Sequence, residues 1–313
     1  MARTVKVVML GTSGGVPTLR RRLPAILIQD WMGTTILLDA GEGVQESLLR
    51  LGLPPTRIDF IAITHSHGDH VNGLPGLLQS MYMYERRRPL LIMGPSSVVE
   101  FVRGVLGVLE YNLGFRVALR AIEGEGSLAL VERGGDKVVI SWAPACHSVE
   151  SYGFRLDWLL RPRIDARLAK ELLGDNMALL RELIARGRVT LDDGRVVRIS
   201  DIAREPGRNL GIAYTGDTAE PCKSLDRILR GVRLLIHDST FTSDKSDEAL
   251  ERGHSTSLMA AKAAAEAGAH LLVLTHVSAR YEGGEARRMV EEARRVFPNV
   301  LLAWDGLTLL FAV

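Results

Sequence analysis

The feature that most constrains this chain is a short apolar run followed at once by a cluster of histidines. Residues 60–63 are apolar and mostly aliphatic, which predicts a buried strand that ends at Thr64. The loop after it carries three imidazoles and a carboxylate: His65, His67, Asp69 and His70. Imidazole and carboxylate are the ligands that suit divalent zinc. The sequence therefore predicts a metal site at the end of a buried strand.

The spacing within this loop predicts two metal ions rather than one. His65 and His67 are two apart on extended chain, so they point the same way and can hold one ion. Asp69 and His70 turn away across Gly68 and can hold a second ion about 3.5–4 Å from the first. The alternative is a histidine-rich surface loop without metal, which the position directly after a buried strand disfavours.

Polar residues follow several other predicted strands, and they complete the ligand set. The residues at these strand ends, or beside them, are His147, Asp217, Asp238 and His276. Strand ends meet at one edge of an α/β sheet, so these side chains are expected to converge there. The first zinc would have His65, His67 and His147 as terminal ligands. The second would have Asp69, His70 and His276, and Asp217 would be shared between the two ions.

Two further residues are predicted to take part in proton transfer. His254 lies just before an alanine-rich helix expected over residues 257–267, with Ser255 or Thr256 as its N-cap. Asp238 could hold His254 as an imidazolium that protonates a leaving oxygen, although a purely structural hydrogen bond is the alternative. Asp39, also at a strand end, could orient a ligand histidine or cap the helix expected over residues 44–51.

Composition places the chain among ordinary globular proteins. With 313 residues, 46% hydrophobic and 24% charged, it could form one large domain or two smaller ones, and either buries a sizeable core; of the two, we favour residues 1–313 as one catalytic domain. No apolar run reaches the roughly 18 residues of a membrane span, and the N-terminus lacks a signal-peptide pattern, so we expect a cytoplasmic protein without membrane contact. The two cysteines are too few for a disulfide framework and indicate a reducing compartment, with Cys146 as a small buried residue.

Arginine clusters point to the substrate. Arg20–Arg22 and Arg86–Arg88 each follow closely on a motif that we assign to the face of the protein that carries the metal site. Because arginine pairs bidentately with phosphate, these clusters favour a polyanionic substrate; a solvated, arginine-rich surface is the alternative. Nearby, residues 11–17 are rich in glycine but lack the spacing of a dinucleotide-binding loop, and Pro17 stands where its helix would begin. We expect a turn whose backbone N–H groups face the site.

Residues 155–200 differ from the rest. Amphipathic helices are predicted over residues 166–173 and 177–186, with a turn at 191–195, and no metal-ligating pattern appears. The segment is therefore an insertion or arm, or else a stretch of chain whose only role is packing. Residues 115–142, before it, are predicted to form a strand meander.

These motifs resemble the metallo-β-lactamase fold and, within it, the ribonuclease Z family of tRNA 3′ processing endonucleases. The resemblance covers nearly the whole chain and is strongest in these segments: Leu10–Thr12, Asp39–Gln45, Thr64–Leu77, Thr215–Thr218 and Thr275–Tyr281. It implies a four-layer αβ/βα sandwich, two zinc ions per subunit, a homodimer, and cleavage of precursor tRNA that leaves a 3′-hydroxyl. It also implies that Asp69 is the general base and that residues 155–190 are a candidate tRNA-binding exosite. Candidate substrate-binding residues are Thr12, Arg86 and Arg280.

The chain departs from the family pattern at two places. The family's His-Glu-Ala-Thr-Phe element is His237–Phe241 here, with the shorter Asp238 in place of glutamate. The family's arm carries a Gly-Pro tip, whereas this arm has Gly174-Asp175-Asn176. Competing functions are a phosphodiesterase for small substrates, an RNA exonuclease of the same superfamily, and a zinc-dependent RNA-binding protein without turnover. The complete ligand set argues against the last.

Overall fold

The computed structural model describes residues 3–108, 113–161, 163–205, 210–281 and 284–313. These residues fall into two compact units. Unit 1 comprises residues 1–128, 140–156 and 211–313, and unit 2 comprises residues 129–139 and 157–210. Within the described residues, no helix is long and apolar enough to cross a membrane.

Most strands of two mixed sheets belong to unit 1, whereas the strand residues within 129–139 belong to unit 2. The strands of the first follow the spatial order β20 (Thr308–Ala312), β1 (Thr4–Gly11), β3 (Ala25–Asp30), β4 (Thr35–Leu38), β5 (Phe60–Ala62), β6 (Leu90–Gly94) and β7 (Val117–Ala121). The strands of the second follow the order β19 (Val300–Leu302), β17 (Leu272–Thr275), β16 (Leu234–Asp238), β15 (Leu210–Tyr214), β10 (Tyr152–Leu159), β9 (Asp136–Pro144) and β8 (Gly126–Arg133). A small parallel pair joins β2 (Ser13–Gly14) to β18 (Val277–Ser278).

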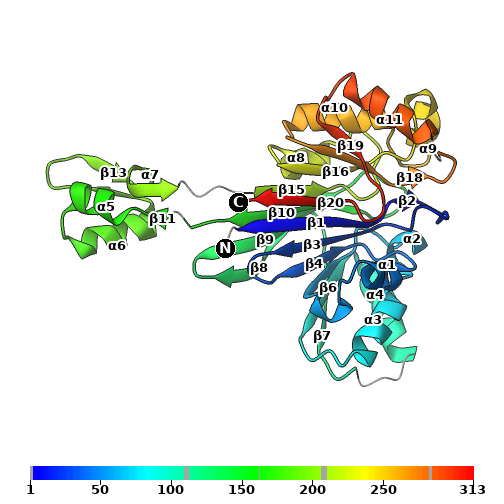
Figure 1. Cartoon of the computed structure of the whole chain (residues 1–313), viewed down its shortest axis with the longest axis horizontal. Helices are drawn as coiled ribbons and strands as arrows, with labels where there is room; N and C mark the ends of the chain where they lie inside the picture. Colours follow the sequence, from blue (N-terminus) through cyan, green and yellow to red (C-terminus); the bar gives the residue numbers. More distant parts are fainter. Residues whose placement is uncertain (1–2, 109–112, 162, 206–209, 282–283) are drawn as a thin grey trace. The chain divides into compact units, whose positions relative to one another are not determined.

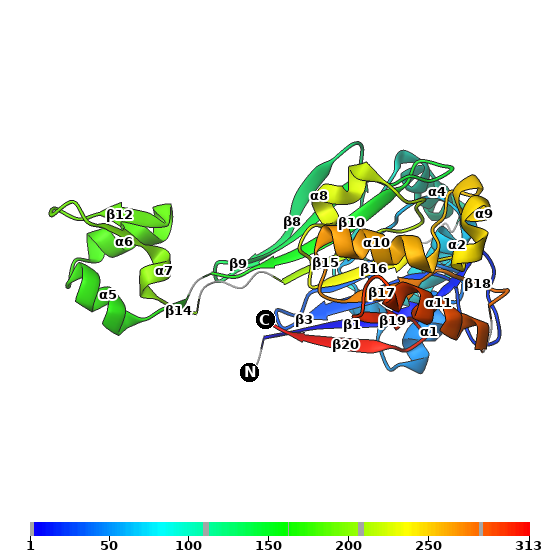
Figure 2. The same ribbon diagram turned by 90° about the horizontal axis from the view of Figure 1, so that it is seen from above.

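Helices cover the outer face of each sheet, giving four layers (Figure 1). The helices on the first sheet are α1 (Val44–Arg50), α3 (Leu74–Met83) and α4 (Ser96–Val108). The short helix α2 (Gly68–Val71) lies between α1 and α3 in the chain, in the segment that follows β5. Those on the second are α8 (Asp226–Leu229), α9 (Ser246–Glu251), α10 (Ser257–Ala267) and α11 (Gly284–Arg294). Figure 2 shows α10 and α11 lying over the strands of the second sheet. The fold is the αβ/βα sandwich that the sequence predicts.

Alternating side chains of the strands explain the layers. In β1, Val8 and Leu10 pack with the helices of the first sheet. The intervening Val7 and Met9 are also buried, on the opposite face. Strands that are apolar on both faces belong inside a sandwich, where each face is covered. Helix α10 spans the predicted residues, and Thr256 caps it by accepting a hydrogen bond from the N–H of Met259 at 3.2 Å.

The predicted meander over residues 115–142 is wrong in one respect. β7 pairs with β6 in parallel and belongs to the first sheet, whereas β8 and β9 are neighbours in the second. The turn at residues 123–125 therefore passes between sheets. β7 is short and β8 is partly exposed, so their periodicity could not show which sheet each of them joins.

Unit 2 has its own small core. Its elements are β11 (Arg163–Ile164), α5 (Ala166–Leu173), α6 (Met177–Arg186), β12 (Arg188–Thr190), β13 (Val196–Arg198), α7 (Ile199–Ile202) and β14 (Ala203–Glu205). Both predicted helices are confirmed at their bounds, and the turn predicted at 191–195 joins β12 to β13. The core side chains include Leu173, Leu183 and Ile202.

Candidate metal centre

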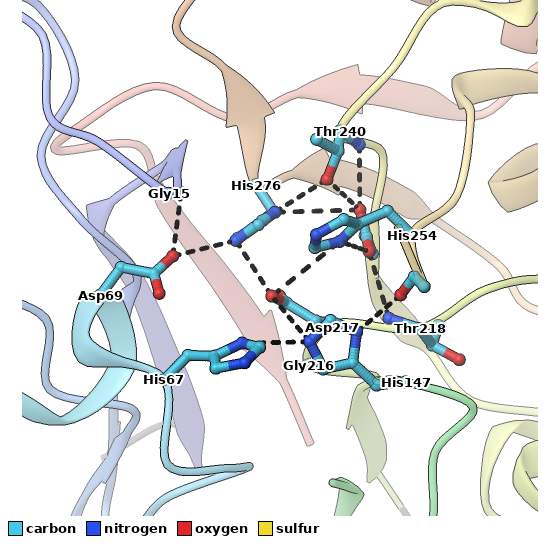
Figure 3. A network of polar contacts seen from close by, with 12 residues as sticks. Gly15, His67, Asp69, His147, Gly216, Asp217, Thr218, Thr240, His254 and His276 are labelled. Carbon is cyan, nitrogen blue, oxygen red and sulfur yellow. Dashed lines mark hydrogen bonds and ion pairs between the residues drawn. The ribbon is translucent and has the colours of Figure 1, made fainter. Parts of the chain in front are cut away.

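The loops after five strands bring the predicted residues into one place (Figure 3). The loop after β5 carries His65 and His67, and α2 follows with Asp69 and His70. Single residues then arrive from four strands of the second sheet: His147 after β9, Asp217 after β15, Asp238 at the end of β16 and His276 after β17. The two sheets thus bring together residues that are far apart in the sequence.

The first group of candidate ligands is His65, His67, His147 and Asp217, whose ligand atoms lie within 4.8 Å of one another. His67 Nδ1 lies 3.0 Å from His65 Nε2 and 3.2 Å from His147 Nε2. Asp217 Oδ2 lies 3.6 Å from His65 Nε2. Three ring nitrogens and a carboxylate oxygen therefore face one point.

The second group is Asp69, His70, Asp217 and His276. Asp69 Oδ2 lies 3.5 Å from His70 Nε2 and 3.3 Å from His276 Nε2. Asp217 contributes both oxygens, with Oδ1 3.4 Å from His70 Nε2 and Oδ2 3.2 Å from His276 Nε2. Asp217 belongs to both groups, as predicted for a shared ligand.

In four of the histidines Nδ1 already makes a hydrogen bond, so Nε2 is the nitrogen that remains for a metal ion. The acceptors at Nδ1 are Thr64 Oγ1 for His65 at 2.9 Å, Asp39 Oδ2 for His70 at 2.7 Å, the Gly253 carbonyl for His147 at 2.7 Å and Thr240 Oγ1 for His276 at 2.8 Å. Thr64 and Thr240 can accept because their own hydroxyls donate to Asp39 and Asp238. In its neutral form, each of the four rings would therefore carry its proton on Nδ1 and present a lone pair at Nε2.

This arrangement fits a pair of divalent cations. Lone pairs of imidazoles and carboxylate oxygens repel one another at these separations unless a cation lies among them. Among the described residues, His70 Nε2 and Asp217 Oδ1 are buried and make no hydrogen bond. Buried polar atoms without a partner are rare, and a metal ion bound between these two atoms would satisfy both of them. Donor sets of this kind, made up of imidazole nitrogens and carboxylate oxygens, suit zinc and related transition metals.

Asp39 anchors the floor of the site. Its fully buried carboxylate accepts hydrogen bonds from the Thr64 N–H at 2.7 Å, the Tyr214 hydroxyl at 2.9 Å and His70 Nδ1. The predicted contact between Asp39 and the free ring nitrogen of a histidine in this loop is present. The alternative cap role is not, because α1 begins after Gly43 without a side-chain cap. Burial first, and then the charge of Asp39, raise the pKa of the Tyr214 hydroxyl well above its usual range, so it stays a donor.

Asp238 and His254 form the predicted pair. Asp238 Oδ2 lies 2.8 Å from His254 Nδ1, so the shorter side chain still reaches. Asp238 also accepts from the Thr218 N–H and the Thr240 N–H, which fix its orientation. Burial alone would lower the pKa of His254, but the Asp238 carboxylate overcomes this and raises it to about 9. His254 keeps 16% of its side chain exposed.

Glycines allow the chain to come close to the ligands. A Cβ on Gly14 would lie 2.5 Å from His276 Nδ1, so β2 can pass this ring only without a side chain. The next residue, Gly15, donates its N–H to Asp69 Oδ2 at 2.9 Å. The expectation that this turn directs a backbone N–H toward the site is confirmed.

The three candidate substrate-binding residues lie in different surroundings. Thr12 is fully buried, and its hydroxyl donates to Asp305 Oδ1 at 2.8 Å. Arg86 is 2% exposed and donates to the carbonyls of Thr56, Arg88 and Pro89, so its guanidinium ties the segment between α3 and β6 to the turn at residues 55–57. Arg280 is 41% exposed at its side chain, is held by Glu248 and lies 5.1 Å from the Phe241 ring. Of the three, only Arg280 presents a charge to solvent.

The prediction for the cysteines was wrong. Cys146 and Cys222 form a disulfide, and Cys146 is exposed rather than buried. Cys146 immediately precedes His147, and its carbonyl accepts from the Ala219 N–H at 2.7 Å. The count of two gave no sign of pairing, because 76 residues separate the partners and only the folded sheets bring them together.

Several polar groups around the centre were not predicted: Thr64, Tyr214, Thr240 and the Gly253 carbonyl. Thr64 could have been noted, because a hydroxyl beside the first histidine is placed to accept from its ring. The others act through contacts between distant segments, for which a single sequence carries no signal.

Comparison with known proteins places the chain in a class. A family profile described as "Anti-Pycsar protein Apyc1" matches residues 5–113, and one described as "Beta-lactamase superfamily domain" matches residues 197–277. The metallo-β-lactamase fold protein YhfI from Bacillus subtilis is similar in structure, with a TM-score of 0.69, 21% identity and coverage of 99% of this chain and 100% of that one. Human tRNase Z, short form, has a TM-score of 0.69 at 25% identity, covering 97% and 98%. The fold and the site thus define a metallo-β-lactamase superfamily protein.

Full-length relatives narrow this class. Ribonuclease Z of Aeropyrum pernix is 49% identical over 305 residues, covering 97% of this chain and 98% of the relative. Ribonuclease Z of Saccharolobus islandicus is 37% identical over 303 residues, covering 96% and 97%. The chain belongs to the ribonuclease Z family.

Proposed function

We propose that the protein is a zinc-dependent endoribonuclease that removes the 3′ trailer from precursor tRNA and leaves a 3′-hydroxyl on the tRNA. Three groups of possible ligands share Asp217, and one of them contains Asp238 and His254. The observation that carries the proposal is the other two groups, which together hold five histidines, with the hydrogen-bonded Asp238–His254 pair beside them. The tRNA substrate is supported by relatives named Ribonuclease Z and by the likeness to human tRNase Z.

Seven side chains would hold two zinc ions per chain. His65, His67 and His147 would bind one ion, Asp69, His70 and His276 the other, and Asp217 both. When bound, such a pair of ions activates water and neutralises charge that develops on a phosphodiester. The hydrogen bonds at Nδ1 would hold the rings in their ligating orientation before any ion arrives.

The chain's own residues would move the protons. Asp69 would take the proton of the attacking water, as its Gly15 contact keeps one oxygen fixed. As the water oxygen bonds to phosphorus, the bond from phosphorus to the 3′ oxygen of the tRNA breaks. His254, held by Asp238, would protonate that leaving oxygen, which yields the 3′-hydroxyl and a trailer with a 5′-phosphate.

Substrate binding would extend beyond the centre. Arg280 would contact a phosphate, because Glu248 and Phe241 hold its guanidinium at a partly exposed position. Residues 155–190 would form an arm that contacts tRNA, inserted into a catalytic domain that includes the rest of the chain. Within unit 2, Arg188 and Arg198 stand directly opposite each other in the β12–β13 pair. Like charges in this position are unfavourable without a counter-anion, which supports a phosphate partner.

Two further parts of the proposal rest on the resemblance to the family. These are a homodimer and a cytoplasmic location, where precursor tRNA would be available. The cysteine argument for a reducing compartment no longer supports the location, since the two cysteines are paired.

Cleavage of a 3′-extended precursor tRNA tests the function, with bis-p-nitrophenyl phosphate run alongside. We expect one cut near the end of the acceptor stem, abolished by a chelator and restored by zinc. His67→Ala should abolish cleavage and lower the bound metal. Turnover of the small diester without tRNA cleavage would favour the phosphodiesterase alternative, to which the absence of a Gly-Pro arm tip also points.

A further inference from the structure

An exposed apolar and cationic surface lies beside the metal centre, outside the site described above. It consists of two segments: the turn at residues 16–20 and Trp304. Val16 is 58% exposed, Leu19 is fully exposed and Trp304 is 53% exposed. Arg20, at the tip of the turn, is also exposed. In the part of the chain that the structure describes, no carboxylate pairs with Arg20, in contrast to Arg22, which is paired with Glu46 at 2.8 Å.

Hydrogen bonds lay the two segments side by side. Arg21 donates to the Ala303 carbonyl at 2.6 Å, and the Arg22 N–H donates to Asp305 Oδ2 at 2.7 Å. The residues on either side of Trp304 are thus both tied to the base of the turn. Within the turn, the Thr18 hydroxyl accepts the N–H groups of Arg20 and Arg21, and the Thr18 N–H donates to the Arg21 carbonyl. Leu19 and Arg20 are therefore held out in solvent by a closed turn.

Both segments adjoin the metal centre. The turn begins at β2, which pairs with β18 directly after His276, and Gly15 contacts Asp69. Trp304 follows β19, in which Leu302 pairs with Leu274 of β17. The Ala303 N–H donates to the Leu274 carbonyl at 2.8 Å, so Trp304 comes directly after a residue that is bonded to the strand leading into His276. A substrate strand that leaves the centre on this side meets an indole, aliphatic side chains and the guanidinium of Arg20.

We propose that this surface binds unpaired nucleotides of the 3′ trailer, with a base stacked on Trp304 and a phosphate paired with Arg20. An exposed aromatic ring beside a cationic side chain is the usual composition of a single-strand binding site. Base faces are available for stacking only in unpaired RNA, so the occupant is the trailer rather than the acceptor stem. The inference rests on the proposed function and adds the segment of substrate that this face recognises.

The test compares two precursors that differ only in trailer length, one with a long unpaired trailer and one with a single trailer nucleotide. Trp304→Ala should raise KM for the long-trailer precursor about 5- to 100-fold. It should leave the short-trailer precursor and bis-p-nitrophenyl phosphate unchanged. Trp304→Phe should restore most of the loss. Arg20→Gln should raise KM for the long trailer alone and reduce its salt dependence. Tyr84→Ala and Arg103→Gln, which alter exposed residues elsewhere, serve as matched controls.

A binding measurement separates this inference from the proposed function. A single-stranded RNA oligonucleotide should quench tryptophan fluorescence of the wild type, and the quenching should be lost in Trp304→Ala even if neither precursor is cleaved. Absent quenching, or an equal KM change for both trailers, would overturn the inference. If a substitution in this surface converts a dimer into a monomer and leaves the kinetics unchanged, the inference is also overturned. The surface would then be an interface between two copies of the chain.

Discussion

The imidazoles at the centre differ from ordinary buried histidines in what holds their Nδ1 atoms. Asp39, the Gly253 carbonyl and the hydroxyls of Thr64 and Thr240 each accept from one ring. These partners leave four Nε2 lone pairs directed at two points. The site is therefore organised by the chain itself, and single substitutions should separate ligand orientation from proton transfer.

Replacing Asp39 by asparagine tests ligand orientation. The amide loses one acceptor in a fully buried position that receives hydrogen bonds from His70, Thr64 and Tyr214. We expect metal affinity to fall about 10- to 100-fold, as is typical when a ligand histidine loses its carboxylate partner. Titration with a competing chelator measures it. Tyr214→Phe, which removes one donor and keeps the carboxylate, should cost much less; equal losses would mean that Asp39 acts through packing alone.

His254→Ala tests proton transfer. We expect cleavage of precursor tRNA to slow by about 10²- to 10⁴-fold, because the leaving oxygen loses its donor. Metal content, measured by atomic absorption, should stay at two ions per chain. Loss of metal in this variant would make His254 a ligand and disprove its role as a donor. A substrate whose leaving group needs no proton, such as bis-p-nitrophenyl phosphate, should be nearly unaffected.

At the scale of elements, substitutions in the β12–β13 pair test whether unit 2 binds tRNA. Arg188→Gln and Arg198→Gln remove two charges that face each other across a two-stranded sheet. If they contact tRNA phosphates, KM for precursor tRNA rises, and the slope of log affinity against log salt decreases by about one per arginine. Hydrolysis of the small diester should not change.

Two controls complete this test. Arg186→Gln removes an arginine that is already paired with Glu182 in α6, and we expect it to leave the salt slope unchanged. Thermal stability of the Arg188 and Arg198 variants should be equal to or above that of the wild type, since a repulsive pair has been removed. A lower stability together with an unchanged salt slope would assign the two arginines to structure.

The elements also show what the sequence can reveal. His65, Asp217 and His276 were predictable because each follows an apolar strand, and strand ends of an α/β sheet converge. The bounds of α5, α6 and α10 were predictable from amphipathic spacing and caps. The sheet to which β7 belongs, and the pairing of Cys146 with Cys222, depend on tertiary contacts between distant segments. No local pattern encodes such contacts.

For the whole molecule, the disulfide is the main covalent constraint. It joins the loop that carries His147 to the loop after Asp217, across a sequence separation of 76, and the segment between its ends includes most of unit 2. Closing a loop of this length restricts the unfolded chain and is worth on the order of 4 kcal/mol. The same link holds Cys146 beside Thr218, whose hydroxyl accepts the Cys146 N–H at 3.2 Å.

Cys146→Ser should therefore lower the midpoint of thermal unfolding by roughly 5–10 °C under non-reducing conditions. Calorimetry measures the shift. Reductant should bring the wild type to the same midpoint and leave the variant unchanged. If reductant shifts both proteins equally, the effect does not come from this bond.

The position of this bond also determines how the chain responds to proteases. A single cut in the part of unit 2 between residues 157 and 210 separates a fragment with His65, His67 and Cys146 from one with Asp217, Cys222 and His276. Both fragments contribute to the same metal centre, and the disulfide lies between them. Nicked protein would thus migrate as one species until it is reduced, and the two halves of the centre would stay covalently joined although the polypeptide no longer is.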